Sequence, residues 1–276
     1  MKFKHLYIPL LILFCAIIFS GSSKNKPVNP PKNGIQLKSG PVTVYTNLDV
    51  PAWLLYLPEG DFAIGVAAKG KLKSDKIEKA ACSFAANSLA KMHSQFEYSA
   101  EDALQYLSDT QQSNSGNPFI VSFNPNLELQ KIYTQELKSL AQTDVFGYRL
   151  FLMGKGNTEL NNDLVRVSAA ALPSWCRINK PYSDKGYIFI TGTAEDKDLL
   201  TACQQAQENA LQKLAVWQLD KLSEEIKATD DPAKKQELIN KAKTNPGPVF
   251  AKIWFYHKTI DAVPFYTVFM QFKAKE

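Results

Sequence analysis

The sequence predicts an α+β fold in which two tandem units each contain a strand, a long helix and a β-hairpin. Hydrophobic residues make up 45% of the chain and aromatic residues 11%, enough for each unit to bury a small sheet against its helix. β-rich runs at 61–67 and 186–194 are each followed by apolar residues at three- and four-residue steps, the spacing of one helix face. The same landmarks recur in the same order in both halves, which indicates an internal duplication.

Residues 1–22 have the pattern of a secretory signal peptide. Lys2 and Lys4 precede an apolar run at 6–19, and small residues follow at 20–22. The apolar run has roughly 14 residues, fewer than the ~20 that a membrane-spanning helix requires. We expect export and cleavage after residue 20, 21 or 22, with an uncleaved interfacial anchor as the alternative.

Cys15 lies in this segment, where a lipid could in principle be attached. Phe14 precedes it directly, at a position where lipoprotein signals have a small residue, and apolar residues continue after it. We therefore predict that the mature chain carries no lipid anchor, which metabolic labelling with a fatty acid checks.

Residues 23–40 are rich in lysine, asparagine and proline and are predicted to form a flexible linker. The formal net charge of the chain is +5, and its lysines are interleaved with acidic residues rather than gathered in a stripe. This pattern predicts a solvated surface and no nucleic-acid partner. Since no second apolar run reaches the length of a membrane span, we expect membrane association to be peripheral at most.

The first repeat unit is assigned to residues 41–172 and the second to residues 173–276, because the second segment repeats landmarks of the first. Four landmarks recur: Pro-x-Trp at 51–53 and 173–175, Gly-x-Ala at 65–67 and 192–194, closely spaced alanines at 81–90 and 206–215, and Gln-Glu-Leu leading to Val-Phe at 135–146 and 236–250. A tryptophan after a proline buries a large ring and fixes how the chain enters a domain, so a packing role is predicted for both tryptophans.

Each unit can be divided into elements by its periodicity and its glycine and proline breaks. The first unit is predicted to contain a strand at 61–67, helices at 74–95 and 99–108, a polar insert at 110–118, a helix at 127–141, and hairpin strands at 145–153 and 164–172. The second is predicted to contain a strand at 186–194, a helix from 195 past 222 whose apolar face includes Trp217, a break at 230–232, a helical piece to about 243, and hairpin strands at 249–257 and 264–273. The β-rich residues 34–46 are expected to pair with the edge of the first sheet.

This series of motifs resembles the LPP-twenty lipoprotein family of bacterial cell envelopes. The resemblance rests on Pro-x-Trp, a strand ending in Gly-x-Ala and alanines four residues apart, and it extends to the hairpin with Phe265-Tyr266-Thr267-Val268, covering most of residues 51–276. It implies an envelope protein, some of whose relatives belong to flagellar or surface assemblies, and it brings no catalytic residue. This chain departs from the family pattern in two ways, because it lacks the lipobox and has two units rather than one.

Three cysteines follow the signal segment, and free, buried thiols are predicted for them. Cys203 lies on an apolar helix face, and it could form a disulfide with Cys82 only if the two long helices meet. No two cysteines have the spacing of a structural zinc site. Among the cysteines and histidines after the signal segment, Cys176 and His257 are the best candidates for a nucleophile and its base. Nothing in their spacing supports the pair.

Two glycine-containing loops and two acidic pairs are explained by structural roles. The loops at 154–157 and 67–73 lack the G-x-x-x-x-G-K-[ST] pattern, so a hairpin turn and a helix lead-in are expected. Glu224-Glu225 and Asp230-Asp231 are expected to be solvated, with metal binding as the alternative. The sequence therefore predicts no catalytic, cofactor-binding or metal-binding residue and no cofactor.

These observations predict a non-enzymatic protein of the bacterial cell envelope, exported to the periplasm or the outer envelope surface. Its expected role is structural or in assembly, with envelope proteins or with itself as partners. The alternative is a periplasmic binding module that holds a peptide, glycan or lipid in the cleft between the two units, and an exported hydrolase comes third. Exposed sheet edges or aromatic patches would favour assembly, whereas one pocket with converging polar groups would favour binding.

Overall fold

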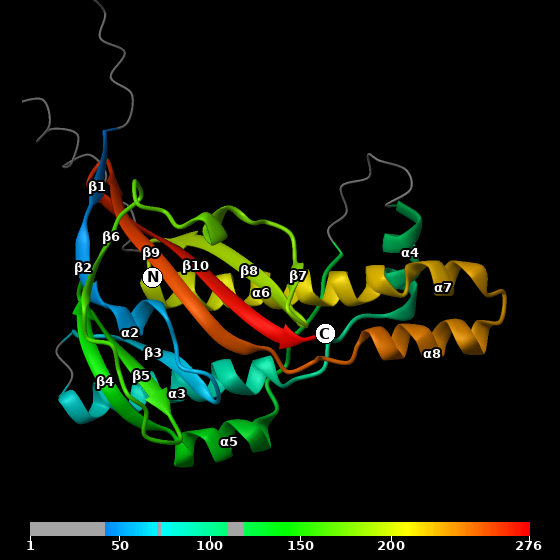
Figure 1. Ribbon diagram of the computed structural model, residues 1–276, viewed down its shortest axis with the longest axis horizontal. Coiled ribbons are helices and arrows are strands. Elements are labelled where there is room, and N and C mark those ends of the chain that lie inside the picture. Colours follow the sequence, from blue (N-terminus) through cyan, green and yellow to red (C-terminus); the bar gives the residue numbers. More distant parts are fainter. Residues whose placement is uncertain (1–41, 71–72, 110–118) are drawn as a thin grey trace, which may run out of the picture. The chain divides into compact units, whose positions relative to one another are not determined.

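Antiparallel sheets packed against helices make up the described part of the chain, so the predicted α+β fold is confirmed (Figure 1). The computed structural model describes residues 42–70, 73–109 and 119–276. The predicted signal peptide, the linker, Cys15 and the polar insert at 110–118 lie outside these residues. None of the helices within the described ranges combines the length and the apolar character of a membrane span.

The described residues form strands and helices, and two pairs of consecutive strands, β4 with β5 and β9 with β10, form hairpins. The strands are β1 (Thr43–Thr46), β2 (Leu48–Pro51), β3 (Phe62–Ala68), β4 (Lys138–Val145), β5 (Tyr148–Gly154), β6 (Leu164–Val167), β7 (Tyr182–Asp184), β8 (Tyr187–Asp196), β9 (Val249–Ile260) and β10 (Val263–Lys275). The helices are α2 (Ala52–Leu55), α3 (Ser74–Met92), α4 (Ala100–Asp109), α5 (Leu127–Glu136), α6 (Leu199–Lys221), α7 (Ser223–Ala228), α8 (Pro232–Ala242) and the short 3-10 helix η1 (Ser174–Arg177).

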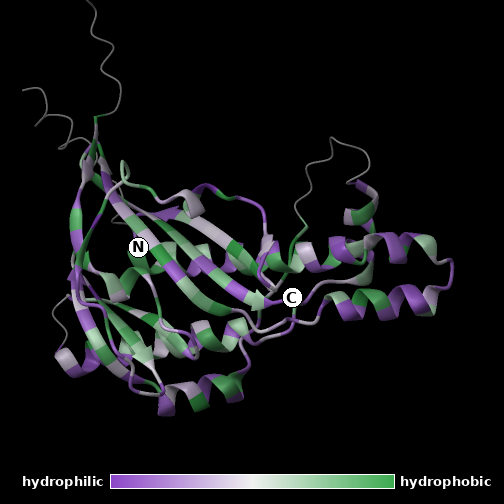
Figure 2. Cartoon of the chain, in the orientation of Figure 1, coloured by the Kyte–Doolittle hydropathy of each residue, from purple (hydrophilic) through white to green (hydrophobic). Residues whose placement is uncertain are grey.

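Within residues 42–70, 73–109 and 119–276, the strands form three antiparallel sheets. One has the order β1-β9-β10-β8-β7, another the order β3-β5-β4, and the last pairs β2 with β6. Hydrophobic and hydrophilic residues alternate along the strands and the helices (Figure 2). This alternation lets one face of each element contact the core, as the period of two in strands and of 3.6 in helices requires.

Glycines in β3 and β8 allow a helix to lie close to each sheet. A Cβ added at Gly65 of β3 would lie 2.7 Å from the carbonyl oxygen of Ala81 in α3. A Cβ at Gly192 of β8 would overlap the carbonyl oxygen of Ala206 in α6 and lie 2.6 Å from the backbone nitrogen of Ala210. Small residues on the strand and on the helix are therefore what set the distance between the two layers.

The two predicted repeat units, residues 41–172 and 173–276, have the same order in three of their strands. β3 pairs with β5, which pairs with β4, and in the same way β8 pairs with β10, which pairs with β9. Trp53 in α2 is 3% exposed and Trp175 in η1 is 8% exposed, so the packing role predicted for both rings is confirmed. Superposition of the two segments, and their origin by duplication, stay predictions.

One of the four repeated landmarks does not mark equivalent positions. Val145 ends β4, and Phe146 with Gly147 forms the turn to β5 at φ values of 48° and 85°. Val249 and Phe250 instead begin β9, at the opposite end of their hairpin. Matching these two dipeptides in the sequence was therefore wrong.

The hairpin predicted for the first unit is also wrong. The predicted helix at 127–141 ends at Glu136, and β4 begins at Lys138 and forms the hairpin with β5. The predicted strand at 164–172 is shorter and pairs with β2 as β6. Residues 138–145 have a helix-like spacing, but pairing with β5 across a two-residue turn decides their conformation.

The β-rich residues before β2 join a different sheet from the one predicted. Their described part is β1, which pairs with β9 in the five-stranded sheet, with Thr46 opposite His257. The prediction that they pair with the edge of the first sheet is therefore wrong. Periodicity identifies a strand but not its neighbour, because the neighbour depends on tertiary structure.

A buried polar pair joins α3 to α6. The Ser88 hydroxyl donates to Gln207 Oε1 at 2.6 Å, and Gln207 Nε2 donates to the Ser88 carbonyl oxygen at 2.8 Å. Both residues are buried. Lys91, about one turn further along α3, forms an ion pair with Glu208, the residue after Gln207. Since each polar group of the pair has a partner, the contact fixes how the two helices lie against each other.

Ala210 is 1% exposed and faces Gly192 of β8, where a Cβ added to the glycine would lie 2.9 Å from the Cβ of Ala210. We expect Ala210→Leu to lower the free energy of unfolding by about 1–3 kcal/mol, because the added methylenes force α6 away from the sheet. Urea denaturation measures this, with Gln205→Leu at an exposed position of the same helix as control. An unchanged midpoint for Ala210→Leu would show that α6 does not pack tightly here.

Candidate functional site

The three cysteines of the described residues are free, as predicted. Cys176 and Cys203 are also buried as predicted, whereas Cys82 is only partly buried, so the prediction of burial is wrong for Cys82. Burial raises the pKa of the Cys176 thiol to about 12 and also raises the pKa of Cys203. Partial burial raises the pKa of Cys82, whose sulfur lies 3.8 Å from the carbonyl oxygen of Thr134. Thiols with raised pKa values carry little thiolate at neutral pH, so these are poor nucleophiles.

His257 belongs to an aromatic cluster. Its ring lies 4.6 Å from the ring of Phe146 and 5.1 Å from that of Tyr266, measured between centroids, and its Nδ1 lies 3.2 Å from Thr46 Oγ1. Burial lowers the pKa of this imidazole. None of the contacts described for His257 involves Cys176, so the structure does not bring this nucleophile–base pair together.

The loop at 154–157 serves to connect elements rather than to hold a phosphate. Lys155 forms ion pairs with Glu136 at 2.9 Å and with Asp61 at 3.2 Å. Its ammonium also lies 4.5 Å from the ring centroid of Tyr133. These contacts fix the end of β5 against α5. The hairpin turn expected here is wrong, because β5 pairs with β3 and β4, whereas the next strand, β6, pairs with β2.

The acidic pairs lie at helix starts. Glu224 and Glu225 are in the first turn of α7, and Asp231 caps α8 by accepting a hydrogen bond from the Ala233 amide at 2.9 Å. Acidic side chains at these places are explained by the partial positive charge of a helix N-terminus. Within the described ranges, no group of three or more potential metal ligands is arranged around one point.

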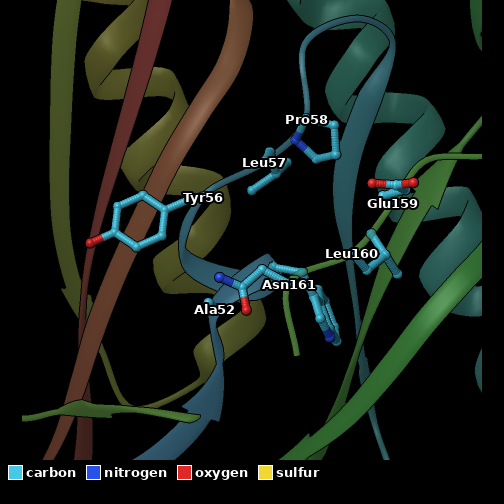
Figure 3. Close-up of a pocket in the computed structure, with 8 residues that line it drawn as sticks. Ala52, Tyr56, Leu57, Pro58, Glu159, Leu160 and Asn161 are labelled. Atoms are coloured by element: carbon cyan, nitrogen blue, oxygen red, sulfur yellow. The ribbon is translucent and has the colours of Figure 1, made fainter. Parts of the chain in front are cut away.

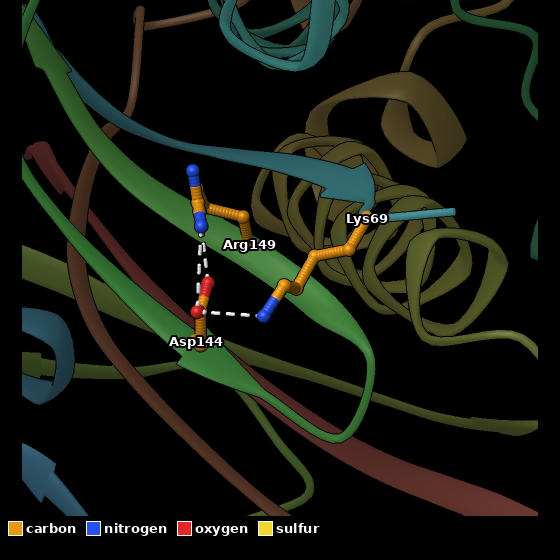
Figure 4. Close-up of polar contacts among 3 residues, drawn as sticks. All are labelled: Lys69, Asp144 and Arg149. Atoms are coloured by element: carbon orange, nitrogen blue, oxygen red, sulfur yellow. Dashed lines mark hydrogen bonds and ion pairs between the residues drawn. The ribbon is translucent and has the colours of Figure 1, made fainter. Parts of the chain in front are cut away.

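Asp144 is held by two cations at one end of the three-stranded sheet (Figure 4). Arg149 Nε donates to its Oδ1 at 2.8 Å, and Lys69 Nζ donates to its Oδ2 at 2.8 Å. The hydrogen bonds from Arg149 and Lys69 lower the pKa of Asp144 to about 2. Because the three residues come from or directly follow β4, β5 and β3, this cluster connects all three strands and has a structural role.

A pocket of about 210 Å³ lies beside α2 (Figure 3). The Trp53 amide donates to the carbonyl oxygen of Asn161 at 2.9 Å, which connects the two walls. The lining residues are Ala52, Trp53, Tyr56, Leu57, Pro58, Glu159, Leu160 and Asn161. This volume is below the roughly 300–1,000 Å³ of typical small-molecule sites, so the pocket is a weak candidate.

The outer edge of β1 is the first strong candidate. Within the described ranges no strand lies on the outer side of β1. Val42, Val44 and Tyr45 are 69%, 53% and 54% exposed, so apolar side chains lie along this edge. Tyr45 also contacts Tyr256 of β9, with 6.1 Å between ring centroids, which extends the aromatic surface onto the neighbouring strand.

Backbone groups of β1 are available on this edge. The Asp261 amide donates to the carbonyl oxygen of Val42, which makes Val42 a hydrogen-bonded position of the β1–β9 pair. Along an antiparallel pair, every second residue directs its backbone N–H and C=O groups toward the partner strand. The backbone groups of Val44 therefore point toward β9, as those of Val42 do, and the backbone groups of Thr43 and Tyr45 point outward. An open edge of this kind is a template for another strand.

A cleft of about 440 Å³ between α4, α6 and the segment after η1 is the second candidate. It brings Tyr106, from the first predicted unit, together with residues of the second. The lining residues are Tyr106, Asn179, Lys180, Pro181, Gln212, Lys213, Val216, Trp217 and Asp220. Its volume lies within the range of small-molecule sites, and polar groups converge on it.

No residue of either candidate was predicted from the sequence to belong to a site. The alternation in Val42 to Tyr45 identifies a strand, but its position at an open edge depends on which sheet it joins. Trp217 was assigned to the apolar face of its helix, whereas it is half-buried and lines the cleft. One sequence signal could have indicated that Trp217 lines a site. It is a tryptophan near the end of the apolar face of a long helix, where the helix extends beyond the sheet.

Comparisons with known proteins assign no family. No family model matches the chain, and no curated protein matches it. A solved structure of a hypothetical protein from Francisella tularensis is similar over 80% of this chain and 84% of that protein, with 14% identity and a TM-score of 0.23. A likeness this weak supports no argument about fold or function.

Proposed function

We propose that this chain is an exported, non-enzymatic protein of the bacterial cell envelope that takes part in an assembly by accepting a strand of a partner protein on β1. The observation that carries the proposal is the edge of β1, which no strand of the described residues covers. Apolar side chains are exposed there, and the backbone groups of Thr43 and Tyr45 face outward. Strand addition of this kind gains affinity from backbone hydrogen bonds and specificity from alternate side chains.

The sequence supports the cellular setting of this proposal. Residues 1–22 have the charge and hydropathy order of a signal peptide, and the motifs at 51–67 and 173–194 resemble those of an envelope family. Of the groups that could have served as a nucleophile, the thiols of Cys176 and Cys203 are buried with raised pKa values. An assembly role is supported by the apolar side chains exposed along this edge, because such an edge is a template for another strand.

Thr43→Pro tests the proposed use of the edge. Proline removes an outward-facing N–H but no hydrogen bond to β9, and edge strands tolerate it where the N–H faces solvent. We expect affinity capture from envelope fractions with tagged full-length protein to recover about tenfold less of the partner, with an unchanged melting temperature. Thr43→Ala, which keeps the N–H, is the matched control.

Three results would contradict the proposal. Equal recovery of the partner by Thr43→Pro and Thr43→Ala would show that the backbone edge is not used. Recovery of the chain entirely in the cytoplasmic fraction would show that it does not act in the envelope. Recovery of a second copy of the chain in place of another protein would contradict the partner and assign the edge to self-assembly.

A further inference from the structure

The cleft beside Trp217 combines an aromatic wall with cations. Lys221 Nζ lies 4.7 Å from the centroid of the Trp217 ring, and the Lys180 and Lys213 side chains line the cleft. Asp220 is the acidic residue of the lining. Lys221 is paired with Glu276 at 3.5 Å, so the net positive charge of the cleft comes from its lining, where Lys180 and Lys213 outnumber Asp220. A net positive lining favours a ligand that carries negative charge.

The polar residues of the cleft differ in how firmly they are held. Lys213 Nζ donates to the carbonyl oxygen of Thr191 at 2.8 Å, and the amide oxygen of Gln212 accepts from the Val121 amide at 3.0 Å. Asn179 and Lys180 have no hydrogen bond or ion pair with other described residues. The cleft thus has a fixed wall on α6 and free polar groups opposite, after η1.

The remaining wall comes from α4. The Tyr106 hydroxyl donates to Asp220 Oδ2 at 3.4 Å, and the Tyr106 ring lies 5.1 Å from the Phe119 ring. Burial and the neighbouring Asp220 raise the pKa of this phenol to about 12, so it stays a neutral donor. A neutral aromatic hydroxyl and a carboxylate side by side suit the hydroxyl groups of a ligand, which both donate and accept hydrogen bonds.

We propose that this cleft binds an acidic sugar, that is, a sugar ring that carries a carboxylate. The apolar C–H face of the ring packs against Trp217, as aromatic rings with an apolar face and a polar edge allow. The carboxylate pairs with Lys180 and Lys213, and the ring hydroxyls bond to Asn179 and Asp220. This site is separate from β1, so it does not depend on the proposed assembly function.

Titration of the full chain with D-glucuronate, followed by tryptophan fluorescence, tests this site. Trp53, Trp175 and Trp254 are less than 10% exposed, so a change in solvent-dependent fluorescence reports mainly on Trp217. We expect saturable binding of glucuronate, and binding of D-glucose about tenfold weaker or less, because glucose lacks the carboxylate. Calorimetry should give the same affinities without relying on fluorescence.

Variants separate recognition of the carboxylate from recognition of the sugar ring. Lys180→Gln removes a lysine that has no hydrogen bond or ion pair with other described residues. It should weaken glucuronate binding about tenfold and leave glucose binding unchanged. Lys234→Gln, an exposed lysine on α8, is the matched charge control and should change neither. Trp217→Leu should weaken both sugars by calorimetry.

Three outcomes would overturn the proposal. The first is the absence of saturable binding by glucuronate, and the second is equal binding of glucuronate and glucose in the native chain. The third is that acetate or trialanine binds tightly, that Lys180→Gln abolishes this binding, and that glucuronate binds no more tightly than they do. This result would assign the cleft to a simple carboxylate or a peptide terminus. Loss of partner capture by Thr43→Pro should leave these affinities unchanged, so the two proposals can fail separately.

Discussion

Gly192→Ala should destabilise the protein by about 3 kcal/mol or more, the largest effect expected for a glycine-to-alanine change among the described residues. A Cβ at this position would overlap the Ala206 carbonyl oxygen and lie 2.9 Å from the Cβ of Ala210, so the backbone of α6 or β8 has to move. Chemical denaturation followed by circular dichroism measures the loss.

Alanine substitutions at two other glycines give stability losses with which that of Gly192→Ala can be compared. Gly65→Ala should be less costly than Gly192→Ala, because its added Cβ would lie 2.7 Å from the Ala81 carbonyl oxygen without the second backbone overlap. Gly156→Ala should be close to neutral, since nothing lies within 4 Å of its added Cβ. Equal stability of Gly192→Ala and Gly156→Ala would show that α6 does not lie directly on β8.

Gln207→Leu should lower the free energy of unfolding by about 1–3 kcal/mol, because it leaves the buried Ser88 hydroxyl without its acceptor. Adding Ser88→Ala should recover part of this loss, since removal of both polar partners costs less than removal of one. A double-mutant cycle in urea measures the coupling between α3 and α6. Strictly additive losses would show that the pair does not join the two helices.

Local patterns predicted the elements that have strong periodicity and clear ends. The apolar spacing from Leu199 to Leu219 predicts α6, and the alternation in β9 and β10 predicts a hairpin around their turn. The alanines that contact Gly65 and Gly192 are also visible in the sequence, as a repeat of closely spaced small residues. Such features follow from the side-chain period of each element, so they can be derived from sequence.

Features that depend on tertiary pairing could not be predicted in the same way. Residues 138–145 continue a helical spacing, yet they form β4 because the Phe146-Gly147 turn brings them beside β5. β1 belongs to the first predicted unit by its position in the sequence, yet it joins the sheet of the second. In both cases the chain gains hydrogen bonds from a partner strand that no local pattern identifies.

The two candidate sites show the same limit at the level of function. The open edge exists because β1 is the last strand of its sheet among the described residues. The cleft exists because α4 and the segment after η1 lie beside α6. Neither site contains a motif, and the residues of the cleft range from Tyr106 to Asp220. Sites made from distant residues without a fixed spacing become visible only when the fold is known.

Site-specific photo-cross-linking in intact cells tests the assembly account most directly. A benzophenone amino acid placed at Tyr45 of the full-length chain should cross-link to one defined envelope protein, and the cross-link should disappear when Thr43→Pro is added. The same probe at Lys234, which is exposed on α8 away from the edge, should give no such product. Absence of a cross-link from position 45, or the same products from positions 45 and 234, would contradict the account.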